Sequence, residues 1–177
     1  DMTVAASDRP AAAHRSLSTQ RLRLWLRMLR ASRGIETELR ERLRSTYGMT
    51  LPQFDVLAAL YAGAALWCVG YDTIYACQDR EDDASVGIGS SALTLGGHVK
   101  AGVAGFYAGA LALWATAFWL LRPDWIALLA LLPAALHLGW QVLTLEDTDA
   151  DNALARFRSN RTLGLLVALA CWVVGNA

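Results

Sequence analysis

The sequence has few cysteines and no arrangement that would pair them. The 177-residue chain contains only Cys68, Cys77 and Cys171, and all three lie within apolar runs. The odd number and the absence of metal-ligand spacing argue against a disulfide framework and against a zinc site. We therefore expect three free thiols that serve as small buried apolar groups.

Charge is nearly absent from several long stretches. Residues 56–78 carry only Asp72, and residues 101–121 and 125–145 carry no charged side chain. Because about 20 apolar residues in a helix cross the hydrocarbon core of a bilayer, each stretch is long enough to span it. Together with the shorter apolar stretch 163–176, they predict about four transmembrane helices, and Pro133 is expected to bend the third. A soluble globular protein is excluded.

The formal net charge is zero, but the two parts of the chain differ in sign. Residues 1–55 hold 10 basic residues, all arginine, against 6 acidic residues, which gives +4; residues 56–177 hold 6 against 10, which gives −4. Residues 1–16 show no periodicity and no signal peptide, and we expect them to be disordered. The basic part thus precedes an acidic membrane part.

The arginine-rich segment at residues 17–55 predicts an amphipathic helix over residues 17–47 that ends at Gly48. Arginines interrupt its apolar stripe every few residues, which excludes a membrane span. Thr50 and Pro52 favour a second helix start, since Thr50 can act as a cap and Pro52 is tolerated in a first turn. The expected fold is all-α, a multi-pass transmembrane bundle at residues 56–177 behind a basic amphipathic helix.

An acidic cluster follows the first apolar stretch. If one continuous helix carries Asp72, Asp79 and Asp83, their side chains share one face within about 20° of each other. Like charges so close destabilise a helix unless a cation binds them. Mg²⁺ binds one or two carboxylates together with substrate phosphates, so the cluster indicates a magnesium-diphosphate site. A solvated acidic helix end with fortuitous spacing is the alternative interpretation.

The residues around this cluster resemble a known family. The segments YDTIYA (71–76) and QDREDD (78–83) are similar to the second aspartate-rich motif of the UbiA superfamily, and of the 4-hydroxybenzoate polyprenyltransferases in particular. The similarity continues through GIGSSAL (87–93) and FRSNRTLG (157–164) and covers residues 61–177.

This resemblance implies a multi-pass enzyme of the bacterial inner membrane that uses Mg²⁺. Such an enzyme moves a polyprenyl group from its diphosphate to an aromatic acid, here 4-hydroxybenzoate, as in ubiquinone-type biosynthesis. By the same resemblance, Asp79 and Asp83 are ligands of the metal and diphosphate. The expected substrate-binding residues are Asp72, Tyr75, Arg80 and Asp82. For Tyr75 and Arg80, an interfacial aromatic residue and a surface charge are equally good interpretations.

Two departures from the family pattern bear on activity. Gly89 stands where a basic residue is usual, and the first aspartate-rich motif of the family does not occur in this sequence. The acidic run at residues 147–152 is expected to be a solvated loop. The chain therefore carries half of the expected site, and association of two copies would be one way to place two such motifs together. A non-catalytic membrane fragment is the alternative.

Residues 18–61 resemble instead the N-terminal part of MarR-type transcriptional regulators, which suggests a chimeric chain joined near residues 57–63. Because the DNA-reading part of that family is missing, we expect no specific nucleic-acid binding, although a regulator fragment is a second functional hypothesis. A further hypothesis is that the arginine-rich helix lies on an anionic lipid surface.

Overall fold

The computed structural model describes residues 9–87 and 89–176 as helices and their connections, with no strand among them. The predicted all-α fold is confirmed. The chain divides into two units, the first of which ends at Leu51 while the second begins at Pro52.

The first unit contains one long helix, α1 (Arg9–Tyr47). It begins eight residues before the predicted start at residue 17, which is consistent with the high helix propensity of the alanines at 11–13. The predicted disorder is thus wrong for residues 9–16, whereas residues 1–8 lie outside the described part. Gly48, with φ +63°, ends the helix as predicted, and its N–H donates to the carbonyl of Arg44.

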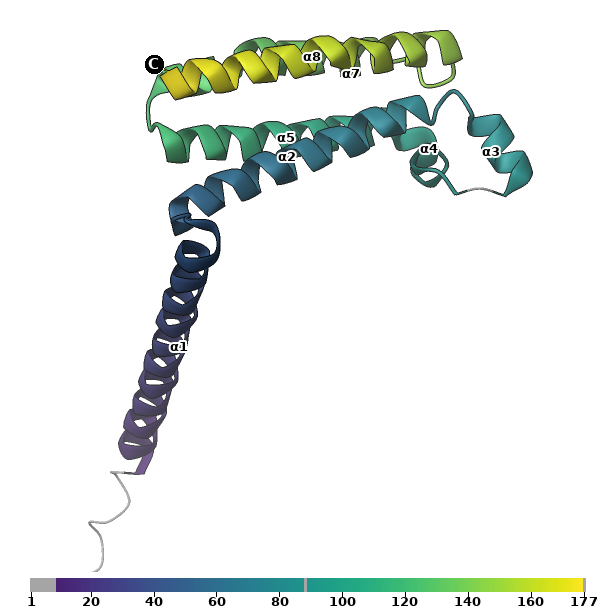
Figure 1. The fold of residues 1–177 in the computed structure, drawn as a ribbon. Coiled ribbons are helices and arrows are strands. Elements are labelled where there is room, and N and C mark those ends of the chain that lie inside the picture. The colour runs from purple at the N-terminus through teal and green to yellow at the C-terminus, as the bar shows by residue number, and fades with distance from the viewer. Residues whose placement is uncertain (1–8, 88, 177) are drawn as a thin grey trace, which may run out of the picture. The chain divides into compact units, whose positions relative to one another are not determined.

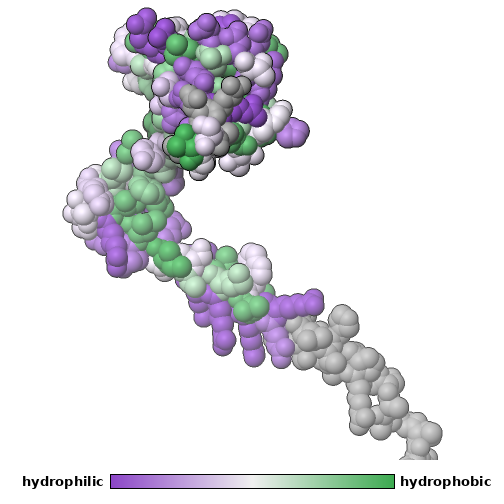
Figure 2. Space-filling view, turned by 90° about the vertical axis from the view of Figure 1, so that its right-hand side faces the viewer, coloured by the Kyte–Doolittle hydropathy of each residue, from purple (hydrophilic) through white to green (hydrophobic). Residues whose placement is uncertain are grey.

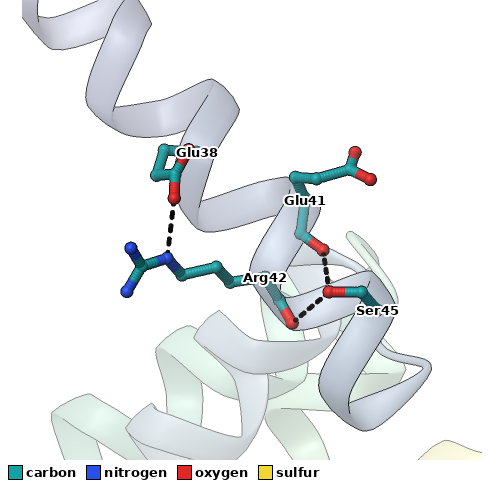
Figure 3. A network of polar contacts seen from close by, with 4 residues as sticks. All are labelled: Glu38, Glu41, Arg42 and Ser45. Carbon is teal, nitrogen blue, oxygen red and sulfur yellow. Dashed lines mark hydrogen bonds and ion pairs between the residues drawn. The ribbon is translucent and has the colours of Figure 1, made fainter.

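Polar contacts support the last turns of α1. Arg42 pairs with Glu38 at 2.7 Å, and the Ser45 hydroxyl donates to the carbonyl oxygens of Glu41 and Arg42 (Figure 3). Arg40 pairs with Glu36 in the same way, at 2.5 Å. These pairs are exposed, so each contributes only a few tenths of a kcal/mol, about 0.3–0.5.

The second unit is a bundle of helices (Figure 1). In chain order they are α2 (Leu51–Tyr75), α3 (Arg80–Val86), α4 (Ser91–Leu95), a 3₁₀ turn (Gly96–His98), α5 (Val99–Leu121), α6 (Trp125–Leu129), α7 (Leu132–Thr144) and α8 (Ala150–Asn176). Within this unit α2 lies beside α5, and α7 beside α8.

Three helical segments of the described chain are long and apolar enough to cross a membrane: Leu51–Tyr75, Ser91–Leu121 and Trp125–Thr144. The last is interrupted at residues 130–131, just before Pro133, as predicted. The expected fourth span lies in α8, which is not among the three. Its apolar stretch 163–174 is shorter than the about 20 residues that a bilayer core requires. The membrane helical bundle is confirmed with three spans.

Two glycines of α2 allow α5 to pack closely against it. A Cβ atom at Gly63 would lie 2.5 Å from Nε1 of Trp114, and one at Gly70 would lie 2.5 Å from Cε1 of Tyr107. Both aromatic side chains are almost fully buried. Close approach through small residues is a common way to associate membrane helices, where apolar surface by itself gives little attraction.

Candidate functional site

The acidic segment lies at a break between two helices. α2 ends at Tyr75, residues 76–79 form a turn, and α3 begins at Arg80. The N–H groups of Cys77 and Gln78 donate to carbonyls three residues earlier, a tighter pattern than in an α-helix. The side-chain amide of Gln78 also donates to the carbonyl of Tyr75. The segment therefore does not form the one continuous helix on which the common face of the three carboxylates was argued.

The break separates Asp72 from the other two carboxylates, so the predicted common face of all three is also wrong. Asp72 remains in the last turn of α2 and is exposed. Asp79 precedes α3 directly, and its carbonyl accepts from the N–H of Asp83 at 2.7 Å. Asp79 and Asp83 therefore remain one helical turn apart. Asp79 is exposed and Asp83 is half-buried, while the side chain of Asp82 lies outside the described part.

The donor set suits a hard cation in part. Two carboxylates one turn apart, open to water, match the one or two protein ligands that Mg²⁺ usually has beside phosphate oxygens and water. No group of three His, Cys, Asp or Glu side chains among the described residues could hold a metal ion by itself. The remaining ligands would have to come from a substrate or from water.

Arg80 links this segment to the connection between α7 and α8. Its guanidinium lies 3.7 Å from the carboxylate of Asp147, and both side chains are about 30 % exposed (28 % and 32 %). Within the run at 147–152, which was predicted to be a solvated loop, residues 148–151 are exposed and Asp147 is partly covered. Cys77 is buried close by. Burial raises the pKa of its thiol, the Asp147 carboxylate raises it further, and Arg80 lowers it.

An aromatic cluster lies next to the acidic segment. The ring of Tyr75 packs against Phe157 of α8 at a centroid distance of 4.8 Å, and Tyr71 lies 5.8 Å from the same ring. The structure thus brings together Tyr75 from the first family-like segment and Phe157 from the last. Tyr75 is 44 % exposed, so it is not fully covered by this contact.

The family-like segment at residues 87–93 is fixed to α2 as well. Ser90 caps α4, because its hydroxyl accepts from the N–H of Leu93. The hydroxyl of the buried Thr73 donates to the hydroxyl of Ser91 at 2.9 Å. Gly89 is exposed and contributes no side chain to the site.

A buried polar network that the sequence analysis missed lies deeper in the bundle. Tyr107 of α5 donates to Gln141 of α7 at 2.8 Å, and Gln141 donates to the hydroxyl of Ser159 in α8 at 2.9 Å. Trp67 of α2 donates to Asn160 of α8 at 2.8 Å. The available signal was an uncharged polar residue, Gln141, within an apolar run.

The fold and the site define a helical membrane protein with an acidic, water-accessible turn beside an aromatic cluster. Residues 45–173 match the UbiA prenyltransferase family, and the chain belongs to that family. The resemblance inferred from the sequence is thereby confirmed, and the match begins before residue 61. The likeness of residues 18–61 to MarR-type regulators stays a prediction. No solved structure matches the chain.

Curated relatives carry names of one activity. The chain is 37 % identical over 124 residues to the mitochondrial 4-hydroxybenzoate polyprenyltransferase of Rattus norvegicus. The aligned region covers 68 % of this chain and 32 % of that protein. It is 39 % identical over 125 residues to the corresponding protein of Homo sapiens, with coverages of 69 % and 33 %. It is 34 % identical over 110 residues to a 4-hydroxybenzoate octaprenyltransferase of Klebsiella pneumoniae, with coverages of 62 % and 38 %. The chain spans about a third of the length of these relatives.

Proposed function

We propose that this protein binds a polyprenyl diphosphate through Mg²⁺ at Asp79 and Asp83 and transfers the prenyl group to 4-hydroxybenzoate, in the inner membrane of a bacterium. The observation that carries the proposal is the pair of carboxylates one turn apart at the end of an apolar, family-matched bundle. A prenyl chain is apolar like the spans of this bundle, and a diphosphate suits the polar end at which the two carboxylates lie.

The residues around the pair have distinct roles in this proposal. Mg²⁺ bound there would act as a Lewis acid on the leaving diphosphate. Arg80 is partly exposed and pairs only loosely with Asp147, so it can turn to a diphosphate oxygen. Tyr75, Tyr71 and Phe157 offer ring faces that stabilise positive charge at the allylic carbon and exclude water.

A binding measurement tests the first half of the proposal. The full chain in lipid nanodiscs should bind a non-hydrolysable prenyl thiodiphosphate with Mg²⁺ and not with EDTA. Asp79→Asn and Asp83→Asn should each weaken binding at least about tenfold, since each removes a charged ligand. Asp55→Asn, an exposed acid in the first turns of α2, is the matched control and should bind normally.

Transfer of the label from a radioactive prenyl diphosphate to 4-hydroxybenzoate tests the second half. Product that requires Mg²⁺ and disappears in Asp79→Asn supports the whole proposal. Normal binding without product would contradict the transfer step for this chain and leave a binding protein. Absence of Mg²⁺-dependent binding by folded protein would contradict the site itself.

A further inference from the structure

Large apolar side chains are exposed on α1 between residues 22 and 29. Leu22, Trp25, Leu26 and Leu29 have exposed fractions of 60 %, 63 %, 44 % and 37 %. At 100° per residue these four positions fall within an arc of about 100° around the helix axis. They therefore form one apolar face, which we call the Trp25 face, and it packs on nothing within its own unit.

A basic face runs beside it. Arg23, Arg27 and Arg30 fall within an arc of about 60° on the neighbouring side of the helix. No acidic residue occurs between Gln20 and Ile35, and none of these three arginines has an ion pair within the described part. By contrast, Arg40 and Arg42 further along pair with Glu36 and Glu38. Figure 2 shows hydrophilic and hydrophobic side chains together along α1.

A short connection ties the end of α1 to the start of α2. Only residues 48–50 separate the end of α1 from the start of α2, which is long and apolar enough to cross a bilayer. The four Cα–Cα steps from Tyr47 to Leu51 span about 14 Å at most. The end of α1 at Tyr47 is therefore always within that distance of the membrane-water boundary at which α2 begins. An attachment this short gives any lipid contact a high effective concentration.

Charge decides which partner fits these two faces. Between Gln20 and Tyr47 there are eight arginines and three glutamates, a net charge of +5. Two copies of α1 brought face to face would repel each other, whereas an anionic lipid surface attracts juxtamembrane basic segments. An apolar face flanked by arginines also has the composition of helices that lie in the interface plane.

We infer that α1 lies on the anionic lipid surface of the membrane that α2 crosses, with the Trp25 face in the headgroup region and Arg23, Arg27 and Arg30 at lipid phosphates. This surface is a binding site for acidic phospholipids separate from the acidic turn at Asp79 and Asp83. The inference does not depend on the proposed enzymatic function.

Spin labels at two neighbouring positions test it in the full chain. In a background without cysteine, Ser32→Cys places a label in line with Trp25, and Ala31→Cys places one near Arg27, at nearly the same point along the helix. In nanodiscs of phosphatidylcholine and phosphatidylglycerol, the label at 32 should collide with oxygen and the label at 31 with a water-soluble nickel chelate. In nanodiscs of pure phosphatidylcholine, the difference between the two labels in oxygen and nickel accessibility should be several-fold smaller. In the anionic nanodiscs, 0.5 M salt should also reduce this difference, which we call the accessibility contrast.

Charge variants give the matched comparison. Arg23→Gln with Arg27→Gln should remove the contrast, whereas Arg40→Gln with Arg42→Gln, which removes the same charge from paired arginines, should largely keep it. Hydrogen exchange of residues 20–47 in the unmodified protein, slower in the anionic nanodiscs, is the measurement that needs no substitution. Equal nickel access at both labels in anionic nanodiscs overturns the inference. Protection that rises with protein concentration and persists in phosphatidylcholine overturns it in favour of self-association.

Discussion

Individual polar side chains contribute strongly to the stability of this bundle when they lie where water is scarce. Gln141 is completely buried within a span, where an unpaired amide would cost several kcal/mol in hydrocarbon, about 2–7. Its oxygen accepts from Tyr107 and its nitrogen donates to Ser159, so both ends of the amide are paired. One residue thereby joins α5, α7 and α8.

We predict that Gln141→Met lowers the stability of the bundle. The substitution keeps the volume but leaves the Tyr107 hydroxyl without its acceptor, which should cost about 1–2 kcal/mol. The loss is measured as a lower midpoint of thermal unfolding in detergent. Thr116→Val is the control, since that exposed hydroxyl donates only to Ala112 of its own helix. A Gln141→Met protein as stable as the control would show that the network does not contribute to the stability of the bundle.

Individual helices are positioned by small residues as much as by large ones. Gly63 and Gly70 lie seven residues apart, which is about two helical turns, so both fall on the face of α2 that meets α5. Their missing side chains leave room for Trp114 and Tyr107. The indole of Trp114 also donates to the carbonyl of Leu60. The pairing of these two helices therefore depends on backbone approach.

Gly70→Ala should separate α2 from α5. The new methyl group would lie 2.5 Å from the ring of Tyr107, closer than any real contact, and overpacking of this kind costs about 1–3 kcal/mol. Gly105→Ala is the matched control on α5, because a Cβ atom there meets nothing within 4 Å. Thermal unfolding of the two variants side by side makes the comparison. If Gly70→Ala unfolds no earlier than Gly105→Ala, the close contact is not what holds the pair together.

At the scale of the helices, the sequence predicted the apolar spans and the helix end at Gly48. It did not predict the break in the acidic segment. Gly48 and Pro133 have local effects on the backbone that do not depend on the rest of the fold, and both acted as predicted. The break at 76–79 depends on Gln78 and on the tightening of the last turn of α2. A periodicity argument assumes a regular helix and cannot detect such a break.

The geometry around the candidate site residues was predicted only in part, and their roles stay a prediction. Asp79 and Asp83 keep the predicted spacing because a new helix starts between them. The contacts of Arg80 with Asp147 and of Tyr75 with Phe157 join residues about 70 to 80 positions apart in the chain. No pattern among neighbouring residues of the sequence predicts contacts between residues so far apart. They follow from how α2, α7 and α8 pack, which a single sequence does not reveal.

The whole molecule contains a conflict over membrane orientation. Basic residues favour the cytoplasmic side of a membrane. If residues 79–100 and 146–162 face the cytoplasm, they place five basic residues there: Arg80, Lys100, Arg156, Arg158 and Arg161. The ten arginines before α2 would then lie on the other side with Arg122. The two halves of the chain therefore favour opposite orientations.

We predict a mixed orientation in cells. In a background without native cysteines, Ser45→Cys and Asp149→Cys are compared for labelling by an impermeant maleimide. Both positions are exposed, and they should each label in a fraction of molecules, since neither orientation satisfies all the arginines. Replacing Arg23, Arg27 and Arg30 by Gln should shift the population toward the orientation with position 149 inside. Labelling at one position only, in every molecule, would contradict the predicted conflict.

The turn at residues 76–79 also separates the carboxylates mechanically from the lipid. At 1.5 Å per residue the 25 residues of α2 extend about 38 Å, more than a hydrocarbon core of about 30 Å. Spanning helices tilt by an amount that changes with bilayer thickness, and this tilt moves their ends. A rigid continuation of α2 would swing Asp79 and Asp83 with every such change. Because α2 ends at Tyr75 and α3 begins at Arg80, a tilt of α2 is not transmitted to the carboxylates through one rigid helix.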